Sequence, residues 1–388
     1  MNNHSAPEKA APEPVLDPAR QQQASQYARL KRRLSLAELL IGAGLLAALL
    51  ISGLSDNLTG LFNMSTVPAA ALYFIGLVLA YQLLTAPLSY YGGYMLPRRY
   101  GLSTQGLGGW LNDVFKAAMM ALLLGVAMVA AVYWFITTWP DAWWLLAWGL
   151  VLALSALITV LAPLFLVPLF FTMKPLADTE LKERLEALAK RARVAVGGIY
   201  VIEFSAKGTT ANAALMGWGR TRRIVLSDTL ITGYSPEEIE VIMAHEMGHQ
   251  RHNDIYRLFV VRAAILLVTF FFTGLIFEAT APVSFGGIAD VATLPLLAMI
   301  FAGLNLLTAP LASGYSRRIE AAADSYALEL TGDARSFINA MTRLTDQNLG
   351  EATPSRWVEN LLYDHPSYAS RVAYANSLSA RKANQEGN

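Results

Sequence analysis

The chain has 388 residues, a formal net charge of +1 and no cysteine. Hydrophobic residues make up 54% of it and charged residues only 15%, a composition typical of a membrane protein rather than of a soluble enzyme. The lack of cysteine excludes disulfides and thiolate metal sites, so any metal must be held by histidine and carboxylate. The nearly neutral net charge gives no sign of a nucleic-acid partner.

The N-terminal segment, residues 1–33, is polar and contains several prolines and a run of three glutamines. Such a composition buries little apolar surface, so we expect a mobile tail there. It is not a cleavable secretory signal, because the first apolar run begins too late and is too long.

Six almost uncharged segments follow, each close to or above the roughly 20 residues that a membrane-spanning helix needs. They are residues 34–54, 67–91, 114–138, 142–172, 256–281 and 291–315. The sequence therefore predicts a mainly α-helical bundle with four spans in residues 34–172 and two in residues 255–315. The more polar residues 173–254 and 316–388 are expected to lie outside the membrane.

Basic residues predict which side of the membrane each loop occupies. Loops 55–66, 139–141 and 282–290 contain no lysine or arginine, whereas basic residues precede the first span and lie between the second and third. By the positive-inside rule, both termini and residues 173–255 are cytoplasmic. Short loops and compact length suggest a bacterial inner-membrane protein.

Residues 173–254 contain both helical and strand-like patterns. Residues 178–193 have leucines at helical spacing with basic residues on the other face. That face either contacts anionic membrane lipid or is simply solvated, and nucleic-acid binding is a third interpretation. Residues 198–204 and 222–227 are rich in branched and aromatic side chains, as strands are. We therefore expect a helix and a small β-sheet.

A further short strand is possible around Asn212 and Ala213, in the run Ala-Asn-Ala-Ala-Leu. It would be either an ordinary hairpin strand or a free edge that pairs with an extended peptide. Sequence spacing alone favours neither.

The segment Ser235–Asp254 has the strongest functional signal. Ser235 suits an N-cap, Pro236 the first helical position and Glu238 the third, as in a capping box. These residues predict a helix independently of the motif that it carries.

That motif is His-Glu-Met-Gly-His over residues 245–249. On a helix, His245 and His249 share a face and can hold one Zn²⁺, with Glu246 beside the metal as a candidate general base. Chance is the alternative, but only five histidines occur in the whole chain.

A third ligand is expected from a second helix over residues 317–331. Glu320 and Asp324 are four apart and share its face, so Glu320 can ligate while Asp324 accepts the free ring N–H of a ligand histidine. An exposed acidic pair is the alternative interpretation. His252 is a rival third ligand, although a place at the rim of the site suits its spacing better.

Two residues near the C-terminus complete the candidate site. His365 opens a helix, and Arg371 follows six residues later. An imidazole close to the metal could stabilise the oxyanion formed when a peptide bond is attacked, although a lone histidine is more often structural.

Together these residues resemble the type I CAAX prenyl proteases, which are integral-membrane zinc metallopeptidases that cleave near a C-terminal lipidated cysteine. The resemblance extends over about residues 67–375. Its motifs are Arg99–Ser103, Pro163–Pro175, Asn212-Ala213, His245–His249, Glu320–Asp324 and His365-Pro366 with Arg371.

The resemblance implies a zincin-like cytoplasmic domain beside spanning helices that enclose a chamber. It implies one zinc ion bound by His245, His249 and Glu320, with Glu246 as the general base. Asp324 would contact a ligand histidine on the side away from the metal. Asn212 and Ala213 would bind the substrate backbone, and His365 and Arg371 would support the transition state or the site geometry.

The expected function is hydrolysis of peptide bonds in lipidated or membrane-associated protein substrates. One alternative is a membrane quality-control protease similar to HtpX. A second is a non-catalytic scaffold or chaperone whose zinc site is closed by His252 or Asp324. A transporter is a third, although internal repeats are not evident.

Overall fold

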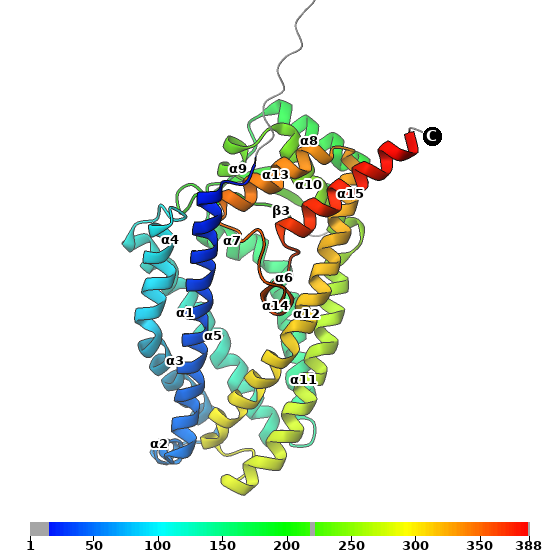
Figure 1. Cartoon of the computed structure of the whole chain (residues 1–388). Coiled ribbons are helices and arrows are strands. Elements are labelled where there is room, and N and C mark those ends of the chain that lie inside the picture. The colour runs from blue at the N-terminus through cyan, green and yellow to red at the C-terminus, as the bar shows by residue number, and fades with distance from the viewer. Residues whose placement is uncertain (1–14, 218–221, 387–388) are drawn as a thin grey trace, which may run out of the picture.

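The computed structural model describes residues 15–217 and 222–386, which are mainly helical (Figure 1). Six helices in these residues are long and apolar enough to cross a membrane, as predicted. They are α1 (Pro18–Ile51), α3 (Thr66–Tyr90) with its continuation α4 (Leu96–Arg99), α5 (Leu107–Thr138), α6 (Trp143–Leu161), α11 (Asp254–Ser284) and α12 (Leu294–Thr331). They form one end of the molecule, and a sheet with shorter helices forms the other (Figure 1).

The shorter elements complete the chain. Two π-helical turns, at Tyr91–Met95 and Ala162–Leu166, continue α3 into α4 and α6 into α7. The short helices are α2 (Leu54–Thr59), α7 (Val167–Phe170), α8 (Thr179–Ala192), α9 (Asp228–Gly233), α10 (Pro236–Arg251), α13 (Ala334–Gln347), α14 (Arg356–Leu362) and α15 (Tyr368–Glu386).

Helix α1 begins much earlier than predicted. It starts at Pro18, so the expected mobile tail is wrong from there to residue 33, while residues 1–14 lie outside the described part of the chain. The Asp17 carboxylate caps the helix by accepting two backbone N–H groups of its first turn. The Arg20 side chain also donates to the backbone oxygen of Asp346 at 3.2 Å. Composition does not reveal such a distant partner.

Helix α12 combines the sixth span with the helix expected at residues 317–331. It runs for 38 residues and accommodates Pro310 in its interior. Gly332, in the left-handed conformation at φ +69°, ends it, so the helix stops at the predicted residue, Thr331. Glu320 and Asp324 therefore lie on the extension of a spanning helix rather than on a separate element.

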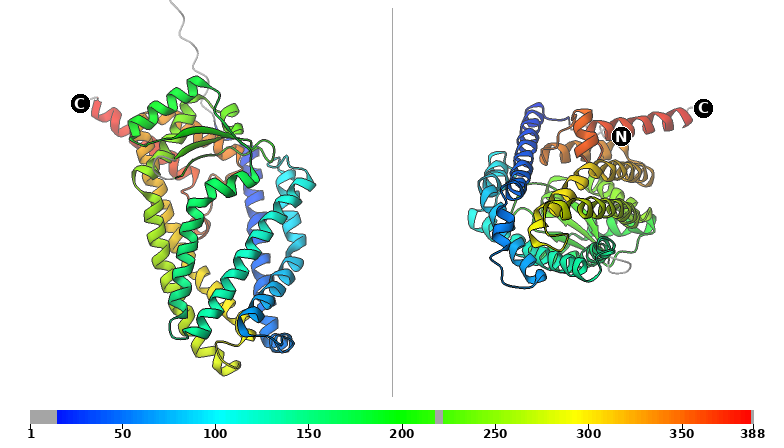
Figure 2. Two further views of the ribbon diagram at one scale, coloured as in Figure 1. Left: turned by 180° about the vertical axis from the view of Figure 1, so that it is seen from behind. Right: turned by 90° about the horizontal axis from the view of Figure 1, so that it is seen from below.

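The sheet has four strands, in the order β1-β2-β4-β3. The strands are β1 (Met173–Pro175), β2 (Gly198–Ile202), β3 (Ala213–Met216) and β4 (Arg223–Ser227). β2 and β4 are the two predicted strands and run parallel, whereas the other two pairs are antiparallel. Three-residue β1 was not predicted, because it is too short to show an alternating pattern. Figure 2 shows the sheet beside α8, above the spanning helices.

The sheet, α8 and α10 share one hydrophobic core. Leu181, Leu185 and Leu188 of α8 are all buried in it, as their helical spacing predicts. Burial of a leucine side chain contributes about 1.5–3 kcal/mol, so this core fixes α10 against the sheet. The core thereby positions the motif that α10 carries.

Helix α10 begins with the predicted capping box. The Ser235 hydroxyl accepts the backbone N–H of Glu238, and the Glu238 carboxylate accepts that of Ser235 at 2.9 Å. After α10 ends, Asn253 adopts a left-handed conformation at φ +55°, and α11 begins at Asp254. The helix with the histidine motif thus joins a spanning helix with almost no linker.

An apolar cavity of about 710 Å³ lies between the spanning helices and agrees with the chamber that the family resemblance implies. Residues of α1, α3, α5, α6, α11 and α12 line it. Glu38 of α1 is the only charged side chain among the described residues of that lining.

Gly248 lets α10 approach α12 closely. A Cβ built on Gly248 would lie 3.2 Å from both Cα of Ala323 and a ring carbon of Tyr326. Such contacts are tighter than ordinary van der Waals packing. The glycine of the histidine motif is therefore a packing residue, and it sets the distance between α10 and α12.

We expect Gly248→Val to destabilise the fold by about 1–3 kcal/mol, the usual cost of overpacking a close helix contact. Thermal unfolding of the purified protein in detergent measures it. Gly303→Val is the matched control, because a Cβ at Gly303 meets nothing within 4 Å. Equal unfolding temperatures for the two variants would contradict the packing role of Gly248.

Candidate metal centre

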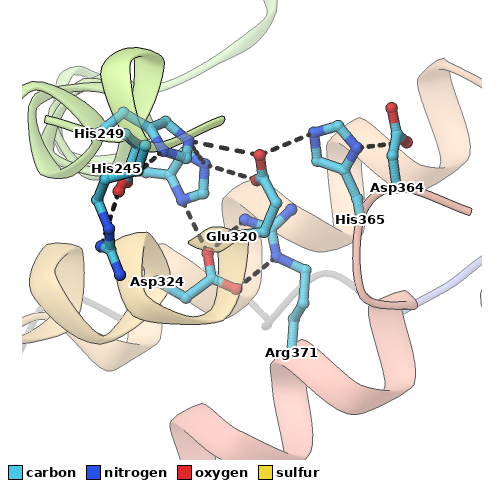
Figure 3. A network of polar contacts seen from close by, with 9 residues as sticks. His245, His249, Glu320, Asp324, Asp364, His365 and Arg371 are labelled. Carbon is cyan, nitrogen blue, oxygen red and sulfur yellow. Dashed lines mark hydrogen bonds and ion pairs between the residues drawn. The ribbon is translucent and has the colours of Figure 1, made fainter. Parts of the chain in front are cut away.

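Three side chains from α10 and α12 converge on one point (Figure 3). The Nε2 atoms of His245 and His249 are 3.2 Å apart. The Glu320 carboxylate faces both, with Oε2 3.2 Å from Nε2 of His245 and Oε1 3.5 Å from that of His249. One potential ligand atom from each residue lies within 4.8 Å of the others. The three residues therefore form a group that could hold a metal ion.

The chemistry of this group suits a cation. Two imidazoles and a carboxylate are the donors that catalytic zinc sites use. Oε2 of Glu320 is buried and accepts no hydrogen bond from the described residues. Burial acts to lower the pKa of His245, but contacts with Asp324 and Glu320 raise it to about 9. The surroundings of the His245 ring thus favour positive charge.

Asp324 and Arg371 lie behind His245. Oδ1 of Asp324 is 2.8 Å from Nδ1 of His245, which leaves Nε2 directed towards the candidate metal position. Arg371 of α15 donates to both oxygens of Asp324, at 2.8 and 2.5 Å. The structure therefore brings Asp324 to the predicted place. Arg371 acts on the site through Asp324 and not by direct contact with the candidate ligands.

Asp254 lies behind His249 and was not identified from the sequence. Its Oδ2 atom is 3.1 Å from Nδ1 of His249, and its Oδ1 accepts a hydrogen bond from Arg257, also at 3.1 Å. A carboxylate five residues after the second histidine was a visible signal. Its position could not be inferred, because the break at Asn253 turns the chain.

Glu246 faces the same cleft from α10. Among the described residues it makes no hydrogen bond or ion pair, so its carboxylate is available to a water molecule or a substrate. Burial raises the pKa of the Glu246 carboxyl. A carboxylate with a raised pKa is a stronger base than an ordinary glutamate.

His365 approaches from the loop between α14 and α15 (Figure 3). Its Nε2 atom is 3.3 Å from Oε1 of Glu320, and its Nδ1 is 2.8 Å from Oδ1 of Asp364. The side chain is 56% exposed. It is therefore beside the candidate ligands and still accessible to a substrate.

These side chains line a cleft of about 660 Å³. Asn212 and Ala213 form part of its wall, at the start of edge strand β3. The backbone N–H and C=O of Asn212 both bond to Ser227 of β4. Because the N–H and C=O groups of successive residues point to alternate sides of a strand, those of Ala213 point away from β4, towards the open edge. The strand therefore fits both interpretations, since it pairs antiparallel with β4, the next strand along the chain, and its other side is an edge of the sheet.

His252 lies elsewhere. Its ring packs edge-on against Tyr326, and it lines a separate cavity with Ser325 and Glu329. Among the described residues it does not belong to the metal-binding group. The expectation of a rival ligand or rim histidine is therefore not met, because His252 lies about one turn beyond His249 and its ring packs against Tyr326.

Two models of known protein families together match almost the whole chain. A family model described as the CAAX prenyl protease N-terminal region, with five membrane helices, matches residues 1–172. The model of peptidase family M48 matches residues 175–379. Within the described part of residues 1–172, four helices are long and apolar enough to span a membrane.

Two relatives of the chain have names that describe proteases. A Bacillus subtilis protein named uncharacterized metalloprotease YhfN is 28% identical over 376 residues, which cover 95% of this chain and 88% of that protein. CAAX prenyl protease 1 of Saccharomyces cerevisiae is 28% identical over 346 residues, with 83% and 76% covered.

A solved structure shares the fold. The crystal structure of S. mikatae Ste24p matches with a TM-score of 0.81 at 23% identity, covering 95% of this chain and 92% of that one. The predicted fold class, a polytopic helical bundle with a small sheet, is thereby confirmed. The chain belongs to peptidase family M48 and is a metalloprotease that spans the membrane several times.

Proposed function

We propose that the chain is a zinc endopeptidase with one Zn²⁺ held by His245, His249 and Glu320. The observation that carries this proposal is the convergence of three ligand atoms within 4.8 Å, beside the carboxylate of Glu246, which has no hydrogen bond or ion pair to the residues that the structure describes. Three protein ligands leave a fourth coordination position open, as in catalytic rather than structural zinc sites.

In the proposed mechanism, Glu246 moves the proton. When bound, Zn²⁺ polarises the scissile carbonyl and lowers the pKa of water at the site towards about 7. Glu246 takes a proton from the attacking water as the water oxygen bonds to the carbonyl carbon. It then delivers that proton to the amine nitrogen as the C–N bond breaks. The site thereby hydrolyses a peptide bond without a covalent enzyme intermediate.

Other residues hold the substrate and the site. The exposed His365 donates a hydrogen bond to the oxyanion that forms at the carbonyl. The open edge at Asn212 and Ala213 pairs with the extended peptide. Asp324, held by Arg371, keeps His245 in the required tautomer and orientation. Arg371 is thus a positioning residue rather than a catalytic one.

We further propose that the substrate is lipidated or otherwise associated with the membrane, and that the site opens to the cytoplasm. The charge distribution of the loops supports this sidedness, with the bacterial inner membrane as the location. The direct junction of α10 with a spanning helix keeps the cleft close to the bilayer. Relatives named CAAX prenyl protease support a lipidated substrate.

A quality-control protease acting on misfolded membrane proteins is the second candidate, because the same site would serve it. A non-catalytic zinc scaffold or chaperone is less well supported, since a structural site needs a fourth protein ligand. His252 faces another cavity, and the Asp324 oxygens are engaged by His245 and Arg371.

The test compares three substrates of the purified full chain: a prenylated CAAX peptide, the same peptide without its lipid, and a misfolded membrane protein. We expect cleavage that a zinc chelator abolishes and that added Zn²⁺ restores. Preference for the prenylated peptide supports the proposal, and preference for the misfolded protein supports quality control. Zinc binding without cleavage of any of the three would favour the scaffold.

A further inference from the structure

Both candidate zinc-ligating histidines contact an aspartate through Nδ1. Behind each Nδ1 lies a nearly fully buried aspartate, Asp324 for His245 and Asp254 for His249. Each aspartate also accepts from an arginine, Arg371 for Asp324 and Arg257 for Asp254. The site therefore contains two parallel chains of arginine, aspartate and histidine.

The aspartates belong to different spanning helices. Asp324 lies on α12, which also carries Glu320, whereas Asp254 is the first residue of α11. Asn253 takes a left-handed conformation and interrupts the helix, and Asp254 contacts His249 from the start of the next helix. Asp254 is 1% exposed, whereas the side chain of its partner Arg257 is about half exposed.

We infer that Asp254 is a positioning residue for the proposed metal centre. Its carboxylate accepts the Nδ1–H of His249, which fixes the tautomer that presents Nε2 to the metal and raises the basicity of that nitrogen. This inference rests on the proposed zinc site. It extends that site to α11, so that both spanning helices following the histidine motif orient a ligand.

A purely structural role for Asp254 makes a different prediction. A carboxylate in the first turn of a helix interacts favourably with the helix dipole, typically by about 0.3–1 kcal/mol. Loss of that interaction would lower the stability of α11 but would not change zinc affinity in protein that is still folded. Metal affinity therefore separates the two roles.

The experiment measures the zinc affinity of full-length protein in detergent by competition with a chromophoric chelator, for wild type, Asp254→Ala and Asp254→Asn. We expect the alanine variant to bind zinc roughly 10–100-fold more weakly, the range for loss of a carboxylate behind a ligand histidine. The isosteric asparagine still accepts the Nδ1–H but has no charge, so its loss should lie at the lower end of that range.

Two further readouts are taken on the same samples. The absorption spectrum of Co²⁺-loaded protein should shift in Asp254→Asn, because the ligand field of His249 changes. At saturating zinc, kcat should fall while KM is unchanged. The matched control is Glu238→Gln, which alters another buried carboxylate with an arginine partner, Arg343, away from the metal group.

Wild-type zinc affinity and Co²⁺ spectrum in Asp254→Asn, or an affinity loss no greater than in Glu238→Gln, would overturn the inference. Failure of the proposed function looks different, because wild type itself would then bind no zinc or cleave no peptide. Should Asp254→Ala fail to fold, the isosteric Asp254→Asn decides the result alone.

Discussion

Glu246→Gln is expected to lower kcat by roughly 10²–10⁴-fold, the contribution typical of a positioned general base. Glutamine has nearly the same shape as glutamate but cannot take a proton from water. His245, His249 and Glu320 are unchanged, so zinc should stay bound at one ion per chain. The measurement is peptide cleavage under saturating substrate, together with zinc content by elemental analysis.

The control for this result is Glu240→Gln on the same helix. Glu240 pairs with Arg184 at 2.5 Å and lies outside the described lining of the cleft. The Glu240→Gln substitution makes the same chemical change on α10 without altering the site, so activity close to that of wild type is expected. Turnover retained in Glu246→Gln would refute its role as base. Loss of zinc from this variant would instead assign Glu246 to metal retention.

The chemistry of the site was more predictable than its surroundings. The capping box at Ser235 and Glu238 predicts α10 from local sequence, and helical spacing then requires that His245 and His249 share a face. Glu320 required a contact across 71 residues of chain, counted from His249. The resemblance to a known family implied that contact, and the convergence of the three side chains agrees with it.

The errors came from tertiary contacts and from a turn. The polar composition before residue 34 predicts a tail, but Asp17 caps a helix that also contacts the distant Asp346. Asp254 was missed because it follows Asn253, whose left-handed conformation redirects the chain so that helical periodicity no longer applies. His252 was given a place near the metal because of its spacing, but it lies about one turn beyond His249 at the end of α10, where its ring packs against Tyr326.

Substituting His365 tests whether the site stabilises an oxyanion. His365→Gln is expected to lower kcat by roughly 10²–10³-fold, the usual cost of removing one such donor. The side chain is largely exposed and its Nε2 lies 3.3 Å from Oε1 of Glu320, so it can contact a substrate oxygen beside the metal. Because this interaction strengthens only as charge develops, KM and zinc content should change little.

His252→Gln is the matched control, since His252 is the histidine of the motif region that faces a different cavity. Its kcat should stay close to that of wild type, which separates loss of a specific donor from loss of an imidazole near α12. If His365→Gln instead raised KM with kcat unchanged, His365 would bind the ground-state peptide. If that variant lost zinc, His365 would be a fourth ligand, the centre would be closed, and the non-catalytic scaffold would become the better explanation. The open coordination position, on which the proposed peptidase depends, is therefore tested most directly at His365.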